Sequence, residues 1–185
     1  MDLVSVDVTL ETPRLFLRTL VPNDVNDDYV SWLNDPEINR YLLTKSATRE
    51  SLRQYIADKR AAADALFLGI FLKPALRMIG TIKLEPIHVA EKNATIAIMI
   101  GDRASQGRGY GPEAMQALIA YTFDTLKLEE INLGVIAEHT GAIRAYEKVG
   151  FRETKRTQGS VRYGESVYDH VTMVLNRAWF NATNT

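Results

Sequence analysis

The spacing of apolar residues changes from one segment of the chain to the next. Some segments repeat apolar residues every three or four positions, as one face of a helix does, and others alternate or run continuously, as strands do. In the middle of the chain, three β-rich runs at 65–73, 77–85 and 94–100 are separated by short connections that contain proline or charged residues. This arrangement predicts three successive antiparallel strands.

Three segments carry a clear helical period. The expected helix that starts at Thr48 has its apolar face at Leu52, Tyr55, Ile56 and Ala63. The long helix expected after Gly111 has its apolar face at Met115, Leu118, Ile119, Phe123 and Leu126. The last expected helix, which Gly150 closes, has its apolar face at Ala142, Ile143, Tyr146 and Val149.

The beginning of the chain predicts a strand at 14–18 and a helix that ends near Asn34. Asp35 and Pro36 then have the residue types of a helix N-cap and first helical position, so a further short helix is expected there. Glu37 would lie near the positive, N-terminal end of that helix, where a negative charge is stabilising.

The end of the chain predicts a buried strand at 131–136 and a final pair of strands at 151–162 and 166–176, joined by a turn near Tyr163 and Gly164. The element order β-α-α-β-β-β-α-β-α-β-β predicts a mixed α/β (α+β) fold, in which helices flank a sheet. We expect one domain over 1–185, with a structured core at about 10–178 and fraying from Asn181 to Thr185.

Composition narrows the class of protein. The 185 residues are 46% hydrophobic, which suits one core, and they include no cysteine, which excludes a disulfide scaffold, thiolate metal sites and a cysteine nucleophile. A net charge of -1 gives no long-range attraction to nucleic acid or to an anionic membrane. No signal-like or membrane-length apolar run is present, so we expect a cytoplasmic protein without nucleic-acid or membrane partners.

The segment 106–111 carries the main chemical signal. Gly107, Gly109 and Gly111 stand between a predicted strand and a strongly amphipathic helix, where they allow a tight turn whose backbone N–H groups converge. The positive end of the helix lies at the same place, so phosphate groups are the expected ligand. We expect Arg103 and Arg108 to add positive charge to this loop.

Glycine-rich loops also occur in other kinds of site. A nucleoside-triphosphate loop needs a lysine and a hydroxyl at its end, and Gly111-Pro112-Glu113 supplies neither. A dinucleotide-binding unit would need glycine in place of Pro112 and a strand near the start of the chain. The glycines could also serve only to connect the strand to the helix, without a ligand, and this interpretation is not excluded.

Two blocks resemble the GNAT N-acetyltransferase superfamily. Gln106-x-x-Gly109-x-Gly111, followed by Glu113-Ala114, resembles the loop that binds the pyrophosphate of acetyl-coenzyme A, and 142–151 resembles the helix that ends in Tyr-x-Lys-x-Gly-Phe. The segments 10–18 and 32–36 extend the resemblance over nearly the whole chain. They are similar to a branch that contains ribosomal-protein N-terminal acetyltransferases and nucleotide amino-sugar acetyltransferases.

The resemblance implies a fold and a cofactor site. The fold is a twisted, mostly antiparallel sheet of about seven strands flanked by about four helices in three layers. The pantetheine arm would lie between strands 96–100 and 131–136, which splay apart. The residues that the resemblance assigns to acetyl-coenzyme A are Met99, Ile100, Gln106, Gly107, Arg108, Gly109, Tyr110, Gly111, His139 and Ala142. At His139 many relatives have asparagine instead.

The resemblance also implies a catalytic acid. Tyr146 matches the tyrosine that protonates the leaving thiolate, although its place on an apolar helix face also fits a packed core tyrosine. Relatives carry a glutamate as general base near the start of the fourth strand, where this chain has Ala94-Thr95-Ile96. Glu85 and His88 are the nearest titratable alternatives, and both also fit solvated turn residues. A mechanism without a side-chain base stays open.

The remaining expectations concern substrates and partners. The candidate acceptor-binding residues are Trp32, Asn34, Asp35 and Arg40, from a segment that resembles one in acetyltransferases of nucleotide-linked amino sugars. The expected reaction is acetyl transfer from acetyl-coenzyme A to the primary amine of a small molecule, either an amino sugar or another small amine such as a polyamine or an amino acid. Transfer to the N-terminus of a protein such as a ribosomal protein, and a non-catalytic acetyl-coenzyme A sensor, are the alternatives. Without cysteine, acetyl should pass directly from thioester to amine. The three histidines lack metal-ligand spacing, so no metal is expected, and a homodimer is possible by resemblance.

Overall fold

The computed structural model describes residues 7–42, 44–163 and 165–183 and places all of its strands in one sheet. In chain order the strands are β1 (Thr9–Glu11), β2 (Leu15–Thr19), β3 (Leu66–Leu72), β4 (Arg77–His88), β5 (Asn93–Ile100), β6 (Glu130–Ile136), β7 (Arg152–Tyr163) and β8 (Ser166–Asn176). They lie in the sheet in the order β1-β2-β3-β4-β5-β6-β8-β7. Every neighbouring pair is antiparallel except β5 and β6, which are parallel.

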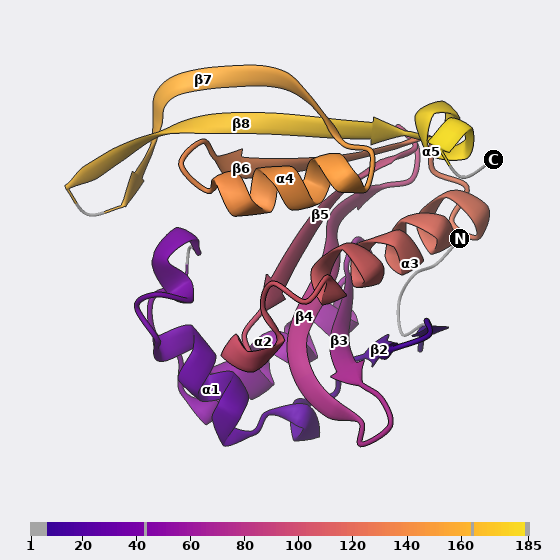
Figure 1. The fold of residues 1–185 in the computed structure, drawn as a ribbon. Coiled ribbons are helices and arrows are strands. Elements are labelled where there is room, and N and C mark those ends of the chain that lie inside the picture. The colour runs from indigo at the N-terminus through magenta and orange to yellow at the C-terminus, as the bar shows by residue number, and fades with distance from the viewer. Residues whose placement is uncertain (1–6, 43, 164, 184–185) are drawn as a thin grey trace.

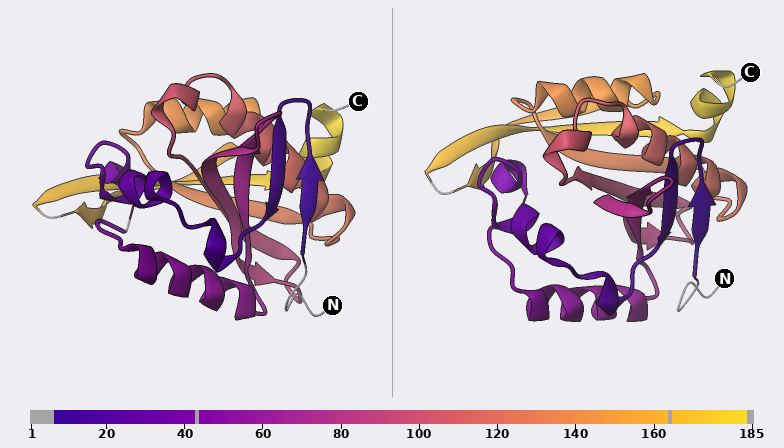
Figure 2. Two further views of the ribbon diagram at one scale, coloured as in Figure 1. Left: turned by 90° about the horizontal axis from the view of Figure 1, so that it is seen from below. Right: turned by 60° about the horizontal axis from the view of Figure 1, so that its bottom comes forward.

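Helices cover both faces of this sheet (Figures 1 and 2). The α-helices are α1 (Asp27–Asn34), α2 (Arg49–Ala61), α3 (Tyr110–Asp124), α4 (Thr140–Lys148) and α5 (Arg177–Thr183). The short 3-10 helices are η1 (Pro22–Asp24), η2 (Asn39–Tyr41) and η3 (Arg103–Ser105). Helices α3 and α4 lie on one face, and α1 and α2 lie on the other.

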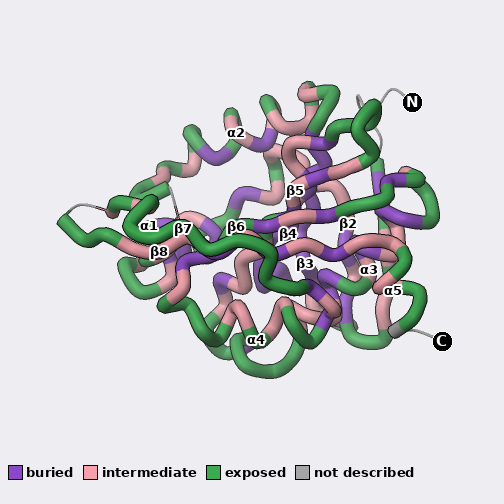
Figure 3. The backbone as a smooth tube through the Cα atoms, turned by 90° about the horizontal axis from the view of Figure 1, so that it is seen from above, coloured by how far each residue is buried: buried purple, intermediate pink, exposed green. Residues whose placement is uncertain are grey.

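Each face of the sheet has its own hydrophobic core. The apolar face of α3, including Met115, Leu118 and Phe123, packs on the larger core. Trp32 of α1 and Ile56 of α2 belong to the second core. Buried residues gather on the central strands, whereas β7 is exposed along most of its length (Figure 3).

The predicted mixed α/β fold and the order of its longer elements are confirmed, with three corrections to the details. Over the described residues the sheet has eight strands rather than about seven, because the short edge strand β1 pairs with β2. The same residues form five α-helices rather than about four, because α5 includes part of the region that we expected to fray. Trp179 and Phe180 of this helix pack on the larger core. Helices and strands therefore begin before residue 10 and continue beyond residue 178, the limits expected for the structured core. The expected turn at Gly164 lies outside the described residues.

The structure also corrects the setting of two candidate residues. Glu85 and His88 lie within β4, which is longer than expected, and not in the turn that follows it. Asp35 does not begin a longer helix: it is the C-cap of α1, and only the short η2 follows.

Strands β4 and β5 approach closely at Gly80. A Cβ atom at this position would lie 2.2 Å from the Met99 carbonyl oxygen and 3.0 Å from Ile100 Cα, which are both backbone atoms of the paired strand. We expect Gly80→Ala to lower the free energy of unfolding by about 1–3 kcal/mol, since the strands must move apart. Chemical denaturation measures the change.

Gly141 provides the matched control. It lies inside α4, and a Cβ atom there would meet nothing within 4 Å. Gly141→Ala should therefore raise stability by roughly 0.5–1 kcal/mol, because alanine loses less backbone entropy in a helix. Equal effects of the two substitutions would contradict the proposed close approach.

Candidate functional site

The site begins where β5 and β6 separate. Their parallel ladder pairs Asn93, Ala94 and Thr95 with β6, and it ends at the pair of Thr95 and Asn132. The Thr95 hydroxyl donates a hydrogen bond of 2.8 Å to Asn132 Oδ1 at this point. Beyond it the two strands diverge (Figure 1). The edge of β5 that faces β6 is therefore open from Ile96 to Ile100, as the resemblance implied.

Two helix N-termini lie at the open end of these strands. Since β5 and β6 are parallel, their C-terminal ends lie at the same edge of the sheet, and a helix begins after each of them: α3 at Tyr110 and α4 at Thr140. A helix N-terminus carries a partial positive charge and unpaired N–H groups. The open end of the strand pair is thus suited to anionic groups.

The glycine-rich loop enters α3 through left-handed backbone conformations. Gly107 has φ 70°, and Gly109, the N-cap of α3, has φ 81°. These values disfavour residues with a Cβ atom, so glycine is required at both positions. Gln106 Nε2 donates a 2.9 Å hydrogen bond to the Ile100 carbonyl oxygen, which ties the loop to the end of β5.

Arg14, which directly precedes β2, holds this loop in place from the other side. Arg14 Nε donates to Glu113 at 2.6 Å, and Arg14 Nη1 donates to the Arg108 carbonyl oxygen at 3.1 Å. The Arg14 guanidinium also lies 4.6 Å from the centre of the Tyr110 ring. Burial alone would raise the pKa of Glu113, but hydrogen bonds from Thr12 and Arg14 hold that pKa below its ordinary value. Glu113 is therefore an ionised anchor of the loop.

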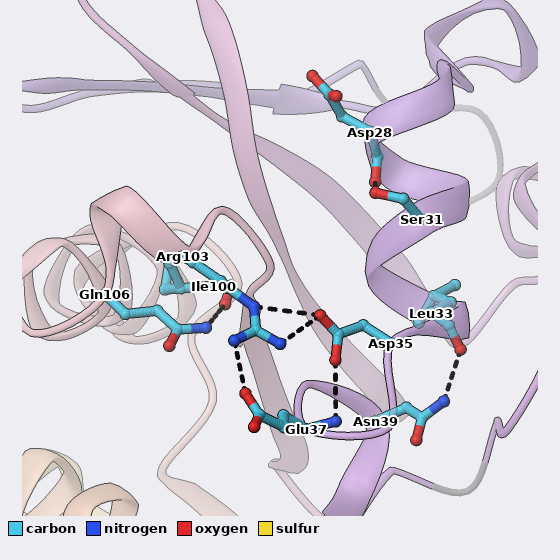
Figure 4. Close-up of polar contacts among 9 residues, drawn as sticks. All are labelled: Asp28, Ser31, Leu33, Asp35, Glu37, Asn39, Ile100, Arg103 and Gln106. Carbon is cyan, nitrogen blue, oxygen red and sulfur yellow. Dashed lines mark hydrogen bonds and ion pairs between the residues drawn. The ribbon is translucent and has the colours of Figure 1, made fainter.

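The two arginines expected at this loop have different surroundings. Arg103 bonds Asp35, with Nη2 2.6 Å from Oδ2, and also pairs with Glu37 (Figure 4). The hydrogen bond from Arg103 lowers the pKa of the Asp35 carboxyl. The expected contribution of Arg103 to positive charge at the loop is therefore corrected, since two carboxylates already neutralise it. Arg108 has no hydrogen-bond or ion-pair partner for its guanidinium in the described part of the chain.

Tyr146 lies on α4 with an unused hydroxyl. Its ring packs against Phe151, with ring centroids 6.3 Å apart, yet the hydroxyl bonds no group among the described residues. Burial raises the pKa of Tyr146 to about 12. A tyrosine that served packing alone would be expected to bond its hydroxyl to a backbone group. The Tyr146 phenol is protonated at neutral pH and free to donate.

His139 is the N-cap residue of α4, but its side chain makes no capping hydrogen bond. Its ring stacks on Tyr41, with centroids 4.8 Å apart and an angle of 29° between the planes. Burial lowers the pKa of His139, so the imidazole is neutral at pH 7. The Tyr163 hydroxyl donates to the Tyr41 carbonyl oxygen at 3.3 Å, so this stack connects the segment after α1 to the β7–β8 hairpin.

Three of the four candidate acceptor residues hold the N-terminal segment together. Trp32 is 7% exposed and packs against Gly101, where a Cβ atom would come within 2.5 Å of its ring. The Asn34 amide nitrogen donates to the Val30 and Ala47 carbonyl oxygens. Asp35, as described, binds Arg103. Arg40 is different: it is exposed, and its guanidinium lies 5.1 Å from the centre of the neighbouring Tyr41 ring.

The surroundings of Glu85 and His88 do not favour either residue as a general base. Glu85 accepts from Lys83 Nζ at 2.7 Å and also pairs with Lys59. Burial alone would raise the pKa of Glu85, but the two lysines lower it below its ordinary value, which makes the carboxylate a weaker base. His88 is exposed and pairs with Asn93 at the closed end of the strands, roughly 20 Å along β5 from Ile100.

Sequence reasoning missed several groups on the face that α1 and α2 cover. Ala97 and Gly134 are exposed in the middle of β5 and β6, and His170 of β8 covers Gly134, where a Cβ atom would lie 2.3 Å from its Nε2. Lys83 pairs in register with Ala97. Strand alternation around the buried Ile82 and Leu84 would have placed Lys83 on this face. Its contact with Tyr55 of α2, and that of His170 with Gly134, join segments that are distant in sequence.

Two further properties concern metal and membrane binding. Within 7–42, 44–163 and 165–183, no group of three or more His, Asp or Glu residues is placed to hold a metal ion. Among the helices of the same residues, none is both long and apolar enough to cross a membrane.

Comparison with known proteins identifies the family. The sequence model of the acetyltransferase (GNAT) domain matches residues 14–152. A relative described as an uncharacterised N-acetyltransferase, p20 of Bacillus licheniformis, is 30% identical over 149 residues, which cover 78% of this chain and 83% of that protein. The spermidine N(1)-acetyltransferase of Vibrio cholerae is 32% identical over 76 residues, which cover 41% of this chain and 43% of that protein.

A solved structure extends the likeness to the whole fold. The crystal structure of the Vibrio cholerae spermidine N-acetyltransferase in complex with CoA and spermine matches with a TM-score of 0.84 at 20% identity, over 92% of this chain and 99% of that one. The strand separation, the glycine loop and the tyrosine helix therefore occur in a chain that belongs to the GNAT family of acetyltransferases.

Proposed function

We propose that this acetyltransferase moves the acetyl group of acetyl-coenzyme A directly to the primary amine of a small molecule, such as a nucleotide-linked amino sugar. The observation that carries the proposal is the separation of β5 and β6, with the glycine loop and two helix N-termini at its open end. The loop 106–111 and Arg108 would hold the pyrophosphate. Met99, Ile100, His139 and Ala142 would line the path of the pantetheine arm.

The reaction needs a polarised carbonyl and a proton donor. Backbone N–H groups on the open edge of β5 would bond the acetyl oxygen and stabilise the negative charge that develops on it. The amine nitrogen attacks the carbonyl carbon, so that a C–N bond forms and the C–S bond breaks. The Tyr146 hydroxyl gives its proton to the sulfur. The proton that the amine loses goes to solvent, from which the phenolate is protonated again.

A side-chain base is not part of this proposal. The two lysines lower the pKa of Glu85, which weakens this carboxylate as a proton acceptor, and His88 lies at the closed end of the strands. The amine would therefore enter in its neutral form or lose its proton through water. This explains how the chain can function with Ala94-Thr95-Ile96 where relatives carry a glutamate.

Two other functions are compatible with the family. Acetylation of a protein N-terminus would need the acceptor opening to admit an extended peptide, and a sensor would bind acetyl-coenzyme A without turnover. The Tyr146 hydroxyl, which bonds no group among the described residues, supports catalysis over sensing. A cytoplasmic location and a homodimer stay predictions.

A thiol-release assay tests the proposed function. Acetyl-coenzyme A is supplied with a panel of primary amines that includes amino sugars, amino-sugar nucleotides, polyamines and peptides with free N-termini. Release of thiol in the presence of a small amine supports the proposal. Coenzyme binding without release for any acceptor would favour the sensor, and release with peptides alone would favour the N-terminal acetyltransferase.

Tyr146 gives a second prediction. Tyr146→Phe should lower kcat by about 10²-fold or more with little change in the KM for acetyl-coenzyme A, because it removes a proton donor and little packing surface. With a donor whose pKa is raised to about 12, the wild-type rate should rise with pH as the amine deprotonates and should not fall before about pH 10. Steady-state kinetics over this range measures both effects.

Tyr121→Phe is the matched control. Tyr121 lies on α3, where burial also raises its pKa, and it packs against the larger core. Its substitution should leave kcat within about twofold of wild type. If both variants turned over normally with intact folding, Tyr146 would not be the acid.

The glycine loop gives a third prediction. Gly109→Ala forces a Cβ atom into a left-handed conformation that costs about 1–2 kcal/mol, so the KM for acetyl-coenzyme A should rise about 10-fold. Gly159→Ala is the control, since Gly159 of β7 also has a left-handed φ of 56° but lies outside the glycine loop. Equal KM values for the two variants would show that the left-handed turn does not position the phosphates.

A further inference from the structure

A cluster of charged side chains lies on the face of the sheet that α2 covers. Lys83 and Glu85 of β4 and Lys59 of α2 form it, together with the Tyr55 hydroxyl. Lys83 Nζ lies 2.7 Å from Glu85 Oε2 and donates to the Tyr55 oxygen at 3.1 Å. The Tyr55 ring also lies near both ammonium groups, with its centroid 5.2 Å from Lys59 Nζ and 5.8 Å from Lys83 Nζ.

The charges in this cluster do not balance. Two ammonium groups share one carboxylate, and the salt bridges of Lys59 and Lys83 in the described part of the chain all end on Glu85. The side chains are only 22%, 29% and 20% exposed for Lys59, Lys83 and Glu85. Burial alone would lower the pKa of Lys83, but Glu85 and Tyr55 raise it above its ordinary value, so the ammonium stays charged. A largely buried surplus positive charge is costly unless an anion pairs with it.

The cluster lies on the face of the sheet that α1 and α2 cover, and α1 carries the candidate acceptor residues Trp32 and Asn34. Lys83 is the register partner of Ala97, and side chains that face each other across an antiparallel pair have Cβ atoms roughly 5 Å apart. Ala97 is exposed although it lies in the middle of a central strand, so none of the described helices covers the sheet at this point. Lys83 uses two of its three N–H donors on Glu85 and Tyr55, which leaves one donor for a ligand.

The phosphates of the coenzyme do not account for this cation. The glycine loop leads into α3, which lies on the opposite face of the sheet from α2 (Figure 2). Lys83 also lies at the level of Ala97, several residues before β5 ends at Ile100. The surplus positive charge of the cluster is therefore not placed to meet the coenzyme phosphates.

We propose that the acceptor is a primary amine that also carries an anionic oxygen group, a carboxylate or a phosphate, and that Lys83 binds this group. Lys59 and Tyr55 are positioning residues, since they hold Glu85 and Lys83 in place. The proposal rests on the proposed acetyl transfer and names its substrate class. It also disfavours a polyamine acceptor, because a polycation would be repelled by the surplus positive charge.

Matched pairs of amines test this assignment. Thiol release from acetyl-coenzyme A is measured with glucosamine and glucosamine 6-phosphate, with glycinamide and glycine, and with spermidine. The first pair tests whether the site recognises a phosphate, and the second tests whether it recognises a carboxylate. Each amine is assayed with wild type, Lys83→Met and Lys83→Arg, and the comparison between variants cancels the intrinsic difference in amine reactivity.

The expected result is a preference of the wild type for one of the anionic amines. Lys83→Met should lower kcat/KM for that amine at least 10-fold, with little change for its neutral partner or in the KM for acetyl-coenzyme A. Lys83→Arg should retain most of the preference, because it keeps the charge. Lys155→Met is the control, since Lys155 is exposed on β7, away from the cluster.

Other outcomes overturn the assignment in distinguishable ways. If thiol release is equal or faster with the neutral amines or with spermidine, the protein is an acetyltransferase but the anion site is refuted. An unchanged preference in Lys83→Met refutes the anion site in the same way. No release with any amine refutes the proposed function itself. If Lys83→Met lacks a cooperative unfolding transition, Lys59→Met removes the other ammonium group and should reduce the preference in the same direction.

Discussion

The rest of the structure depends on the end of the parallel ladder between β5 and β6 at Thr95 and Asn132. Backbone N–H and C=O groups inside a protein require partners, and beyond this pair the facing edges of the two strands no longer supply them to each other. A substrate arm that lies along β5 can replace the missing strand. The same parallel arrangement brings the starts of α3 and α4 to one edge, so that the open backbone and the positive helix ends lie at the same edge of the sheet.

Two arginines hold the elements around this opening, and both are themselves neutralised. Arg14 ties the start of β2 to the start of α3 through Glu113, and Arg103 ties the segment before the glycine loop to the C-terminus of α1 through Asp35. Their carboxylate partners have lowered pKa values, so the braces persist at neutral pH. Within the described residues the Arg108 guanidinium has no partner. Arg14 and Arg103 therefore support the fold, whereas Arg108 is the arginine suited to a ligand.

The parts that could be predicted from the sequence are those determined by local pattern. The apolar face of α3 and the glycines at 107 and 109 follow from spacing and backbone conformation, so the loop and its helix were predictable. Strand β1 was missed because its three residues carry too short a pattern. The contact of Arg103 with Asp35, and those of Lys83 with Tyr55 and of Glu85 with Lys59, were missed because these partners lie far apart in sequence and meet only once the sheet has formed.

The contact between Arg103 and Asp35 joins the C-terminal end of α1 to the segment that leads into the glycine loop. Exposed ion pairs of this kind are individually worth little, so the two segments are coupled without being locked. They are therefore not modular. An attempt to change acceptor specificity by grafting the 35–45 segment from a relative would also remove the carboxylates that orient Arg103, and such a graft would have to carry a compatible residue at position 103 with it.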